Sequence, residues 1–313
     1  MHLITRRFVI NRMLRSLSLV ASGLPFARAQ AQRPAPPQGA SELLILSTND
    51  THSRLDPFPH DGSRNAGFGG VARRATLIRR FRDRYPNVLL LDAGDIFQGT
   101  PYFNFFKGEP EIKAMTALGY DCATPGNHDF DAGVDGLAKA LQFARFPLVS
   151  ANLDASGSIL EGAWKPWITR LFGDYKVGIF GLTVKLAGLV PSALFAGVNW
   201  SDPVTAARKS VAELEAEGCH AIICLSHLGF GDDLHEDKML AREVPGIDLI
   251  VGGHTHRFLD EPVEVQSHTG TSVAITQQGW AGIRLGAMRA TLDTSKPFRL
   301  AQHKGIPIRG AWG

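Results

Sequence analysis

The sequence has few cysteines and no apolar run that approaches the ~20 residues of a membrane-spanning helix. Its three cysteines, Cys122, Cys219 and Cys224, exclude a small scaffold held together by several disulfides. An odd number leaves at least one thiol free. The sequence alone leaves a bridge between Cys219 and Cys224 open.

The chain also has little net charge once its first 29 residues are set aside. The formal charge is +3 at pH 7, but residues 1–29 hold five arginines and no acidic residue. Removing those five positive charges leaves −2 for the rest of the chain. Such a chain offers no general basic surface, which argues against a nucleic-acid polymer as partner. A hydrophobic content of 44% is ordinary for a folded domain and excludes a disordered chain.

The first 29 residues predict an export signal. An arginine-rich start with the pair Arg6-Arg7 precedes a short uncharged segment at 16–24 and a cleavage sequence, Ala27-Arg28-Ala29. The arginine pair resembles a twin-arginine signal, and a Sec signal is the alternative. We therefore expect a signal peptide at 1–29, a Pro-rich linker at 30–40 and a periplasmic or secreted product.

Buried-strand patterns alternate with helical patterns along the rest of the chain. Continuous apolar runs that end in polar residues occur at 43–46, 88–91, 221–225 and 247–251. Helical spacing of apolar residues occurs at 71–84, 112–118, 134–144 and 204–217. This order predicts an α/β domain with ligand sites at the carboxyl ends of its strands. Further strands are expected at 272–277 and 284–292, within one domain at 41–295 that is followed by a tail at 296–313.

Metal-capable side chains repeatedly follow these apolar runs. Any one of them alone would be read as a turn, capping or surface residue, but their repetition indicates a common site. The candidates are Asp50, His52, Asp95, Asn127, His227, His254 and His256. Asp50 and His52 are two residues apart, as are His254 and His256, so each pair can point to one ion from an extended segment. Oxygen and imidazole donors suit two divalent ions and do not distinguish zinc, manganese, iron and cobalt.

Five sequence blocks around these residues resemble the calcineurin-like metallophosphoesterases, specifically the catalytic domain of the 5'-nucleotidase family. The blocks are NDTH at 49–52, GDIFQGTP at 94–101, GNHDFD at 126–131, SHLG at 226–229 and GGHTH at 252–256. They follow that family's order and spacing across about residues 41–295. Asp129 departs from the family's usual glutamate. The family's C-terminal domain, which holds the nucleoside base, is not matched, so we expect a stand-alone catalytic domain.

The resemblance implies a fold and a role for each site residue. The fold is a four-layer α/β sandwich in which two packed β-sheets are flanked by helices. The resemblance implies two divalent metal ions, one held by Asp50, His52 and His256, the other by Asn127, His227 and His254, with Asp95 bridging both. It also implies that His128 is the catalytic acid and that Asp131 orients its ring.

The implied activity is release of phosphate from nucleoside monophosphates or related small phosphate esters by attack of a metal-bridging hydroxide. A cyclic-nucleotide or other phosphodiesterase on the same site is the main alternative. A metal-binding module without catalysis is a second, although such a module would not need the His128 and Asp131 pair. The exported thiosulfohydrolases share the architecture but lack the block at 126–129. A partner chain that supplies a nucleoside clamp is compatible with the sequence.

Two groups of aromatic residues are candidates for contacting a base. One group adjoins the helix expected at 112–118, so we expect it to pack in the core: Tyr102, Phe103, Phe105 and Phe106. The other consists of Trp164, Trp167 and Trp200, which nothing in the sequence ranks.

Overall fold

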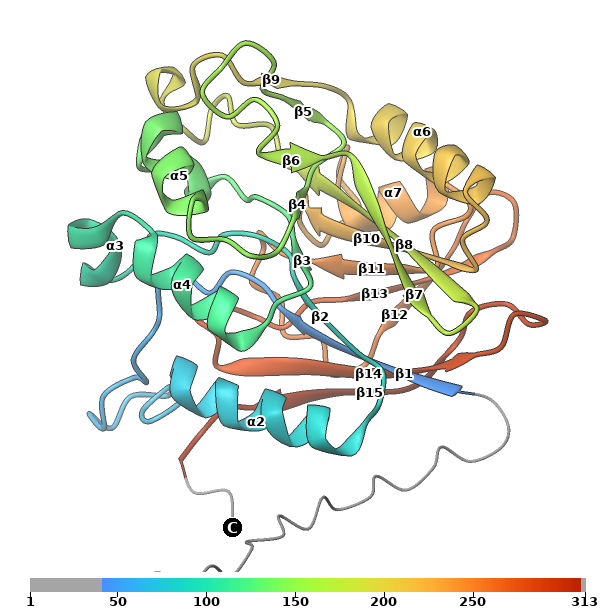
Figure 1. The fold of residues 1–313 in the computed structure, drawn as a ribbon, viewed down its shortest axis with the longest axis horizontal. Helices are drawn as coiled ribbons and strands as arrows, with labels where there is room; N and C mark the ends of the chain where they lie inside the picture. The colour runs from blue at the N-terminus through green and yellow to red at the C-terminus, as the bar shows by residue number, and fades with distance from the viewer. Residues whose placement is uncertain (1–40, 311–313) are drawn as a thin grey trace, which may run out of the picture. The chain divides into compact units, whose positions relative to one another are not determined.

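Two β-sheets pack face to face in the computed structural model, which describes residues 41–310 (Figure 1). The expected α/β sandwich of two packed sheets flanked by helices is confirmed. The signal peptide at 1–29 and the linker at 30–40 lie outside the described residues and stay predictions. No helix within residues 41–310 has the length and apolarity that a membrane span requires.

The first sheet has seven strands in the order β15-β14-β1-β2-β3-β4-β6. Its parallel strands are β1 (Ser41–Thr48), β2 (Val88–Asp92), β3 (Cys122–Ala123), β4 (Leu148–Val149) and β6 (Trp164–Lys165). Two antiparallel strands complete it, β14 (Arg284–Leu292) and β15 (Leu300–Pro307).

The second sheet has six strands in the order β12-β13-β11-β10-β8-β7. Its parallel centre consists of β8 (Tyr175–Thr183), β10 (Ala221–His227), β11 (Leu249–Gly252) and β13 (Ser272–Thr276). Its antiparallel edges are β7 (Trp167–Phe172) and β12 (Val263–Gln266). A separate two-stranded sheet pairs β5 (Leu153–Asp154) with β9 (Asn199–Trp200).

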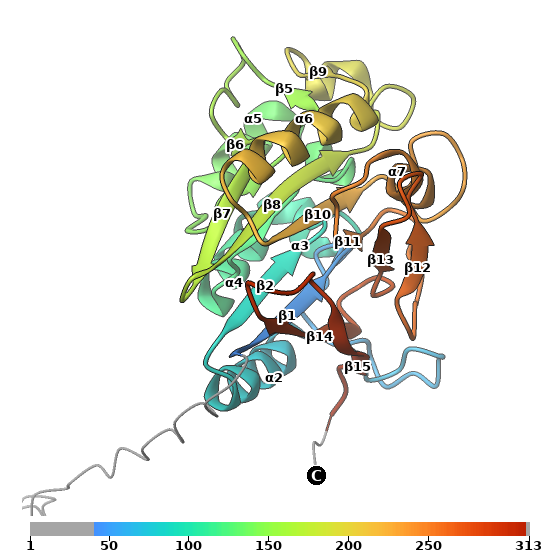
Figure 2. The same ribbon diagram turned by 90° about the vertical axis from the view of Figure 1, so that its right-hand side faces the viewer.

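Helices cover the outer face of each sheet, as Figure 2 shows for α2 and α6. Against the first sheet pack α2 (Val71–Arg84), α4 (Glu109–Leu118) and α5 (Gly133–Leu141). Against the second sheet pack α6 (Pro203–Ala216) and α7 (Asp237–Glu243). The remaining helical segments are α3 (Pro101–Phe106), η1 (His128–Phe130) and η2 (Ser192–Phe195).

Successive side chains of β1 point to opposite faces of the first sheet, and both faces are covered, which explains the continuous apolar run. Leu44 and Leu46 point to the helix side of the sheet, whereas Leu43 and Ile45 point to the second sheet, and all four are buried. A parallel strand covered on both faces buries every side chain, so no polar alternation remains. The carboxyl-terminal residues of β1, β2, β10 and β11 are therefore buried, which fixes where the loops after them begin.

Three features differ from expectation or resolve an open question. The segment expected to be a tail contains β15, which pairs with β14; Gln302, His303 and Lys304 interrupt its apolar residues, so no continuous apolar run marks the strand. Phe103 is buried as expected, but the core assignment of Phe105 and Phe106 is wrong, because their side chains are 79% and 55% exposed. The three cysteines are free, so the bridge left open between Cys219 and Cys224 is not formed.

The layer between the sheets should dominate stability. Ile223→Ala removes a fully buried side chain of β10 from that layer and is expected to lower the free energy of unfolding by about 2–5 kcal/mol. Leu171→Ala on β7, where the side chain is 66% exposed, serves as the control and should change it by less than about 0.5 kcal/mol. Urea unfolding measures both, and equal losses would contradict the two-sheet packing.

Candidate metal centre

The seven predicted ligands all lie at or just beyond the carboxyl ends of strands. Asp50 and His52 follow β1, Asp95 follows β2, and Asn127 follows β3. His227 is the last residue of β10, and His254 and His256 follow β11. Strands from both sheets thus contribute to one site, as expected for parallel strands that end at a common edge.

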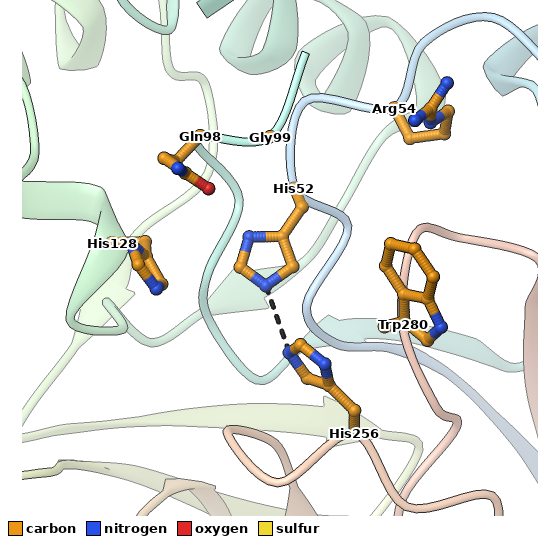
Figure 3. Close-up of a pocket in the computed structure, with 7 residues that line it drawn as sticks. All are labelled: His52, Arg54, Gln98, Gly99, His128, His256 and Trp280. Carbon is orange, nitrogen blue, oxygen red and sulfur yellow. Dashed lines mark hydrogen bonds between the residues drawn. The ribbon is translucent and has the colours of Figure 1, made fainter.

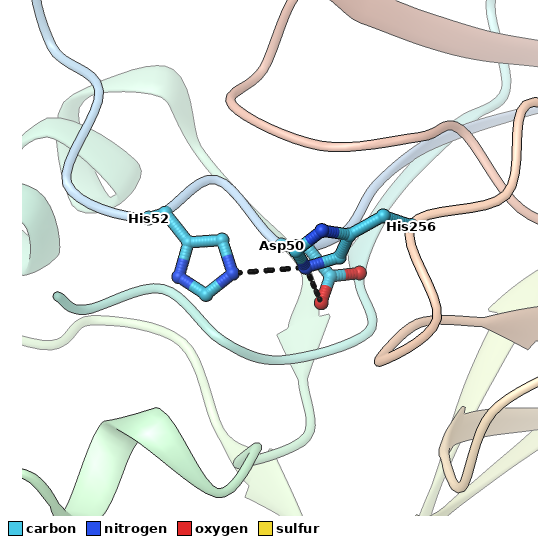
Figure 4. A group of neighbouring side chains, drawn as sticks. All are labelled: Asp50, His52 and His256. Atoms are coloured by element: carbon cyan, nitrogen blue, oxygen red, sulfur yellow. Dashed lines mark hydrogen bonds and ion pairs between the residues drawn. The ribbon is translucent and has the colours of Figure 1, made fainter. Parts of the chain in front are cut away.

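The first group of potential ligands consists of Asp50, His52 and His256 (Figure 4). One ligand atom from each lies within 4.8 Å of the other two. His256 Nε2 lies 3.3 Å from Asp50 Oδ1 and 3.1 Å from His52 Nε2. Two imidazole nitrogens and a carboxylate oxygen that face a common point form a donor set that suits a divalent ion.

The second group consists of Asp95, His227 and His254, again with ligand atoms within 4.8 Å of one another. Asp95 Oδ2 lies 3.1 Å from His227 Nε2 and 3.8 Å from His52 Nε2 of the first group. The Asp95 carboxylate therefore faces imidazole nitrogens of both groups. The Asp50 carboxylate reaches the second group through the backbone N–H of His254, at 3.0 Å.

Asn127 lies beside the second group, and its side chain has an unused acceptor. Its neighbour His128 donates its backbone N–H to Asp95 Oδ1 at 2.8 Å. On the other side, a Cβ added to Gly126 would collide with Asp95 and His227, so this position requires glycine. Within the described residues, the buried Asn127 Oδ1 and His227 Nε2 have no hydrogen-bond partner. An unsatisfied buried amide oxygen beside an imidazole nitrogen that faces a carboxylate fits a bound cation.

The second ring nitrogens of two histidines are held by backbone carbonyls. His227 Nδ1 lies 2.6 Å from Ala93 O, and His52 Nδ1 lies 3.1 Å from Phe97 O. A ring nitrogen that faces a carbonyl donates its proton, which leaves the lone pair of Nε2 directed into the site. Both rings are thus oriented as metal ligands require.

The charges of the site also favour cations. Asp50 and Asp95 are fully buried, and among the described residues their ion-pair partners are histidines alone. Burial opposes ionisation of Asp95, but His227, His52 and His128 outweigh burial and lower its pKa. Burial, together with the neighbouring His227, lowers the pKa of His254 to about 4, so that imidazole is neutral and free to coordinate. Buried carboxylates without lysine or arginine partners are typical of metal sites.

The backbone of the site is held in an unusual conformation. Five predicted ligands have left-handed φ values: Asp50 at 49°, His52 at 46°, Asp95 at 54°, His254 at 71° and His256 at 54°. Each such non-glycine residue costs roughly 1–3 kcal/mol and persists where the surroundings fix it. Backbone bonds from Asp50 N to Gly94 O (2.8 Å) and from His52 N to Asp95 O (3.0 Å) tie the first two loops together.

Asp129 joins the loop of Asp95 to the loop of Asn127. Its buried carboxylate accepts the backbone N–H groups of Ile96 at 2.9 Å, Phe97 at 3.0 Å and Gly126 at 2.7 Å. An aspartate at this position thus reaches all three donors. This carboxylate fixes the distance between the two loops.

His128 lies at the solvent side of the centre. Its Nδ1 lies 2.8 Å from Asp131 Oδ2, and this hydrogen bond raises the pKa of His128. With His52 and His256 it lines an open cavity of about 290 Å³ (Figure 3). A partly exposed imidazole with a raised pKa beside metal-capable groups can act as a proton donor.

The same cavity is lined by residues that the sequence analysis missed, namely Arg54, Gln98 and Trp280. The Trp280 ring stacks on His256 with centroids 6.0 Å apart and an interplanar angle of 13°. Arg54 follows His52 by two residues and Gln98 lies within the block at 94–101, so the sequence held a signal for both, whereas it held none for Trp280. The tryptophans that remained candidates do not line this cavity; their indole N–H groups are bonded to Leu153 O, Glu213 and Thr183 O.

Comparisons with known proteins agree with this geometry. The family model described as calcineurin-like phosphoesterase matches residues 43–258. The human 5'-nucleotidase is 39% identical over 82% of this chain and 48% of its own length; a snake venom 5'-nucleotidase of Gloydius brevicauda is 39% identical over 82% and 46%. The chain thus spans about half the length of the curated relatives it matches.

Two solved structures show the same relation. A 5'-nucleotidase precursor from Thermus thermophilus superposes with a TM-score of 0.76 at 36% identity, over 86% of this chain and 55% of the other. An NAD nucleotidase from Haemophilus influenzae gives 0.78 at 28% identity, over 87% and 57%. Since the family model covers more than half of the sequence, the chain belongs to the calcineurin-like phosphoesterase family.

Proposed function

We propose that this protein is an exported phosphohydrolase with two divalent metal ions that releases phosphate from nucleoside monophosphates or related esters. The observation that carries the proposal is the position of Asp95 between two groups of potential ligands, with the His128–Asp131 pair beside them. Asp50, His52 and His256 would hold one ion, Asn127, His227 and His254 the other, and Asp95 both. Ions bound there would supply Lewis acidity and lower the pKa of a bound water.

Proton transfer to the leaving group is carried out by side chains of the protein. His128 faces the cavity in which a phosphate ester would bind, and it donates a proton to the departing alkoxide. Asp131 holds the ring at Nδ1 and raises the pKa of His128, which favours the protonated form that a proton donor requires. A catalytically silent metal-binding module would have no need of such an oriented proton donor.

The nucleotide class is supported by the names of the relatives, which include 5'-nucleotidases and an NAD nucleotidase. The direct experiment is phosphate release by protein stripped of metal and reloaded with zinc, manganese or cobalt. The panel contains AMP, cyclic AMP, a nucleotide sugar and phenyl phosphate. Release from AMP supports the proposal, hydrolysis of cyclic AMP alone supports a phosphodiesterase, and metal binding without turnover supports the silent module.

Export is supported by the arginine pair and the cleavage sequence of residues 1–29 and by relatives named as venom enzymes. Replacing Arg6 and Arg7 together by lysine is expected to retain the precursor in the cytoplasm, because the arginine pair distinguishes the twin-arginine signal. Cell fractionation and immunoblotting measure this. Undiminished export of the Lys-Lys variant would indicate the Sec route instead.

The role of His128 predicts a loss of rate without a loss of metal. His128→Ala is expected to lower kcat by about 10² to 10⁴ while metal content stays at the wild-type value. His268→Ala, an exposed histidine beside β12, is the matched control and should retain activity. Steady-state kinetics and elemental analysis measure the two quantities. Loss of metal in His128→Ala would show that this side chain is a ligand.

The bridging role of Asp95 predicts a loss of metal. Asp95→Asn preserves shape but removes the carboxylate that faces imidazole nitrogens of both groups, so two neighbouring cations would be poorly screened. We expect at least one metal equivalent to be lost. Asn127→Ala, which removes one neutral ligand, should lose less. Two retained equivalents in Asp95→Asn, measured by elemental analysis, would exclude a bridge.

A further inference from the structure

Arg54 lies at the junction of two cavities. It lines the metal-centre cavity together with His52 and His128. It also lines a neighbouring cavity of about 300 Å³, whose wall is formed by Tyr102, Phe105 and Phe106 of α3. A molecule that extends from the metal centre towards α3 therefore passes the Arg54 side chain, which Figure 3 shows on the opposite side of His52 from His128.

The Arg54 side chain has unused binding capacity. Among residues 41–310 it has no ion-pair partner, and its buried Nε has no hydrogen-bond partner. Its guanidinium carbon lies 4.2 Å from the centre of the Phe58 ring. This contact with the ring face positions the guanidinium and leaves its N–H donors free. A positioned guanidinium with free donors is suited to a phosphate group.

The aromatic wall is exposed although its helix is firmly anchored. Phe103, on the same helix, is buried and stacks on Phe97 with centroids 5.9 Å apart. Tyr102 donates its hydroxyl to Asp56 Oδ2 at 2.8 Å. Phe105 and Phe106 nevertheless have 79% and 55% of their surface exposed. Adjacent exposed aromatic rings that line a mostly apolar cavity are typical of a surface that stacks a planar ligand.

We infer that Arg54 and the aromatic wall of α3 form a subsite for the leaving group of a nucleoside diphosphate. The inference rests on the proposed function, since it places the terminal phosphate at the metal centre. The inner phosphate then meets Arg54, and the base packs against Phe105 and Phe106. Asp56, which also lines the second cavity, is engaged by Tyr102 and retains acceptor capacity for a ribose hydroxyl.

The reaction at this subsite is hydrolysis of a phosphoanhydride. The oxygen of water forms a bond to the terminal phosphorus, and the bond from that phosphorus to the bridging oxygen breaks. The bridging oxygen leaves with the inner phosphate, one proton of the water passes to solvent, and the other stays on the inorganic phosphate. The products are a nucleoside monophosphate and inorganic phosphate, with no oxidation or reduction.

Binding measurements can test the role of Arg54 and the role of the aromatic wall separately. Titration calorimetry on metal-loaded protein would compare three non-hydrolysable probes: the α,β-methylene analogue of ADP, methylenediphosphonate and phenylphosphonate. Arg54→Gln is expected to weaken binding of the ADP analogue and of methylenediphosphonate by ~10- to 100-fold, as for a lost hydrogen bond to a charged group. Its effect on the binding of phenylphosphonate should be at least five times smaller. Replacing Phe105 and Phe106 by alanine should weaken the ADP analogue alone, by ~10- to 100-fold.

The controls are Arg80→Gln on α2 and Leu171→Ala on β7, which are exposed and do not line either cavity. Equal weakening of all three probes by Arg54→Gln would overturn the inference, as would an unchanged affinity for the ADP analogue in the double phenylalanine variant. Failure of wild-type protein to bind the ADP analogue would also overturn it. Absence of turnover of both AMP and ADP, with binding intact, would contradict the proposed function instead.

Discussion

Two carboxylates, Asp50 and Asp95, are buried in a site where the described residues offer them histidines as ion-pair partners and neither lysine nor arginine. Negative charge buried in this way destabilises a domain unless cations or proton donors compensate it. The rest of the site is consistent with compensation by metal ions. The histidine rings present lone pairs, the Asn127 oxygen is unsatisfied, and Gly126 leaves space for the carboxylate. Two metal ions in the proposed centre would neutralise the negative charge of these two carboxylates.

The fold supplies the rigidity that this centre demands. Strands that are buried on both faces end at a common edge, and the loops that follow adopt left-handed conformations that a flexible segment would abandon. Asp129 connects two of these loops through three backbone donors, and backbone bonds connect β1 to the loop of Asp95. The chemistry that we propose therefore depends on residues that contact neither substrate nor metal.

Much of this arrangement is predictable from the sequence because burial leaves a local signature. The helix at 71–84 was predicted with the bounds that α2 has, and the apolar runs of β1, β2, β10 and β11 marked the strands whose ends carry the ligands. The features that could not be predicted leave no periodic pattern of apolar residues in the sequence. The edge strand β15 has no continuous apolar run and is defined by its pairing with β14, and Trp280 reaches the site from a loop after β13. Phe105 and Phe106 were expected in the core because they are large and apolar and adjoin the helix expected at 112–118. Their exposure depends on which segments pack against α3, and the local sequence does not show that.

The central claim is that Asp95 is shared by two metal ions held by different strands. Anomalous diffraction from crystals of the metal-loaded protein, collected above and below the absorption edge of the metal, tests this most directly. The account predicts two anomalous peaks about 3.5–4 Å apart, as in two-metal phosphatases, with an oxygen of Asp95 in contact with both. One peak should lie against Asp50, His52 and His256 and the other against Asn127, His227 and His254. A single peak, or two peaks of which Asp95 contacts one, would contradict it.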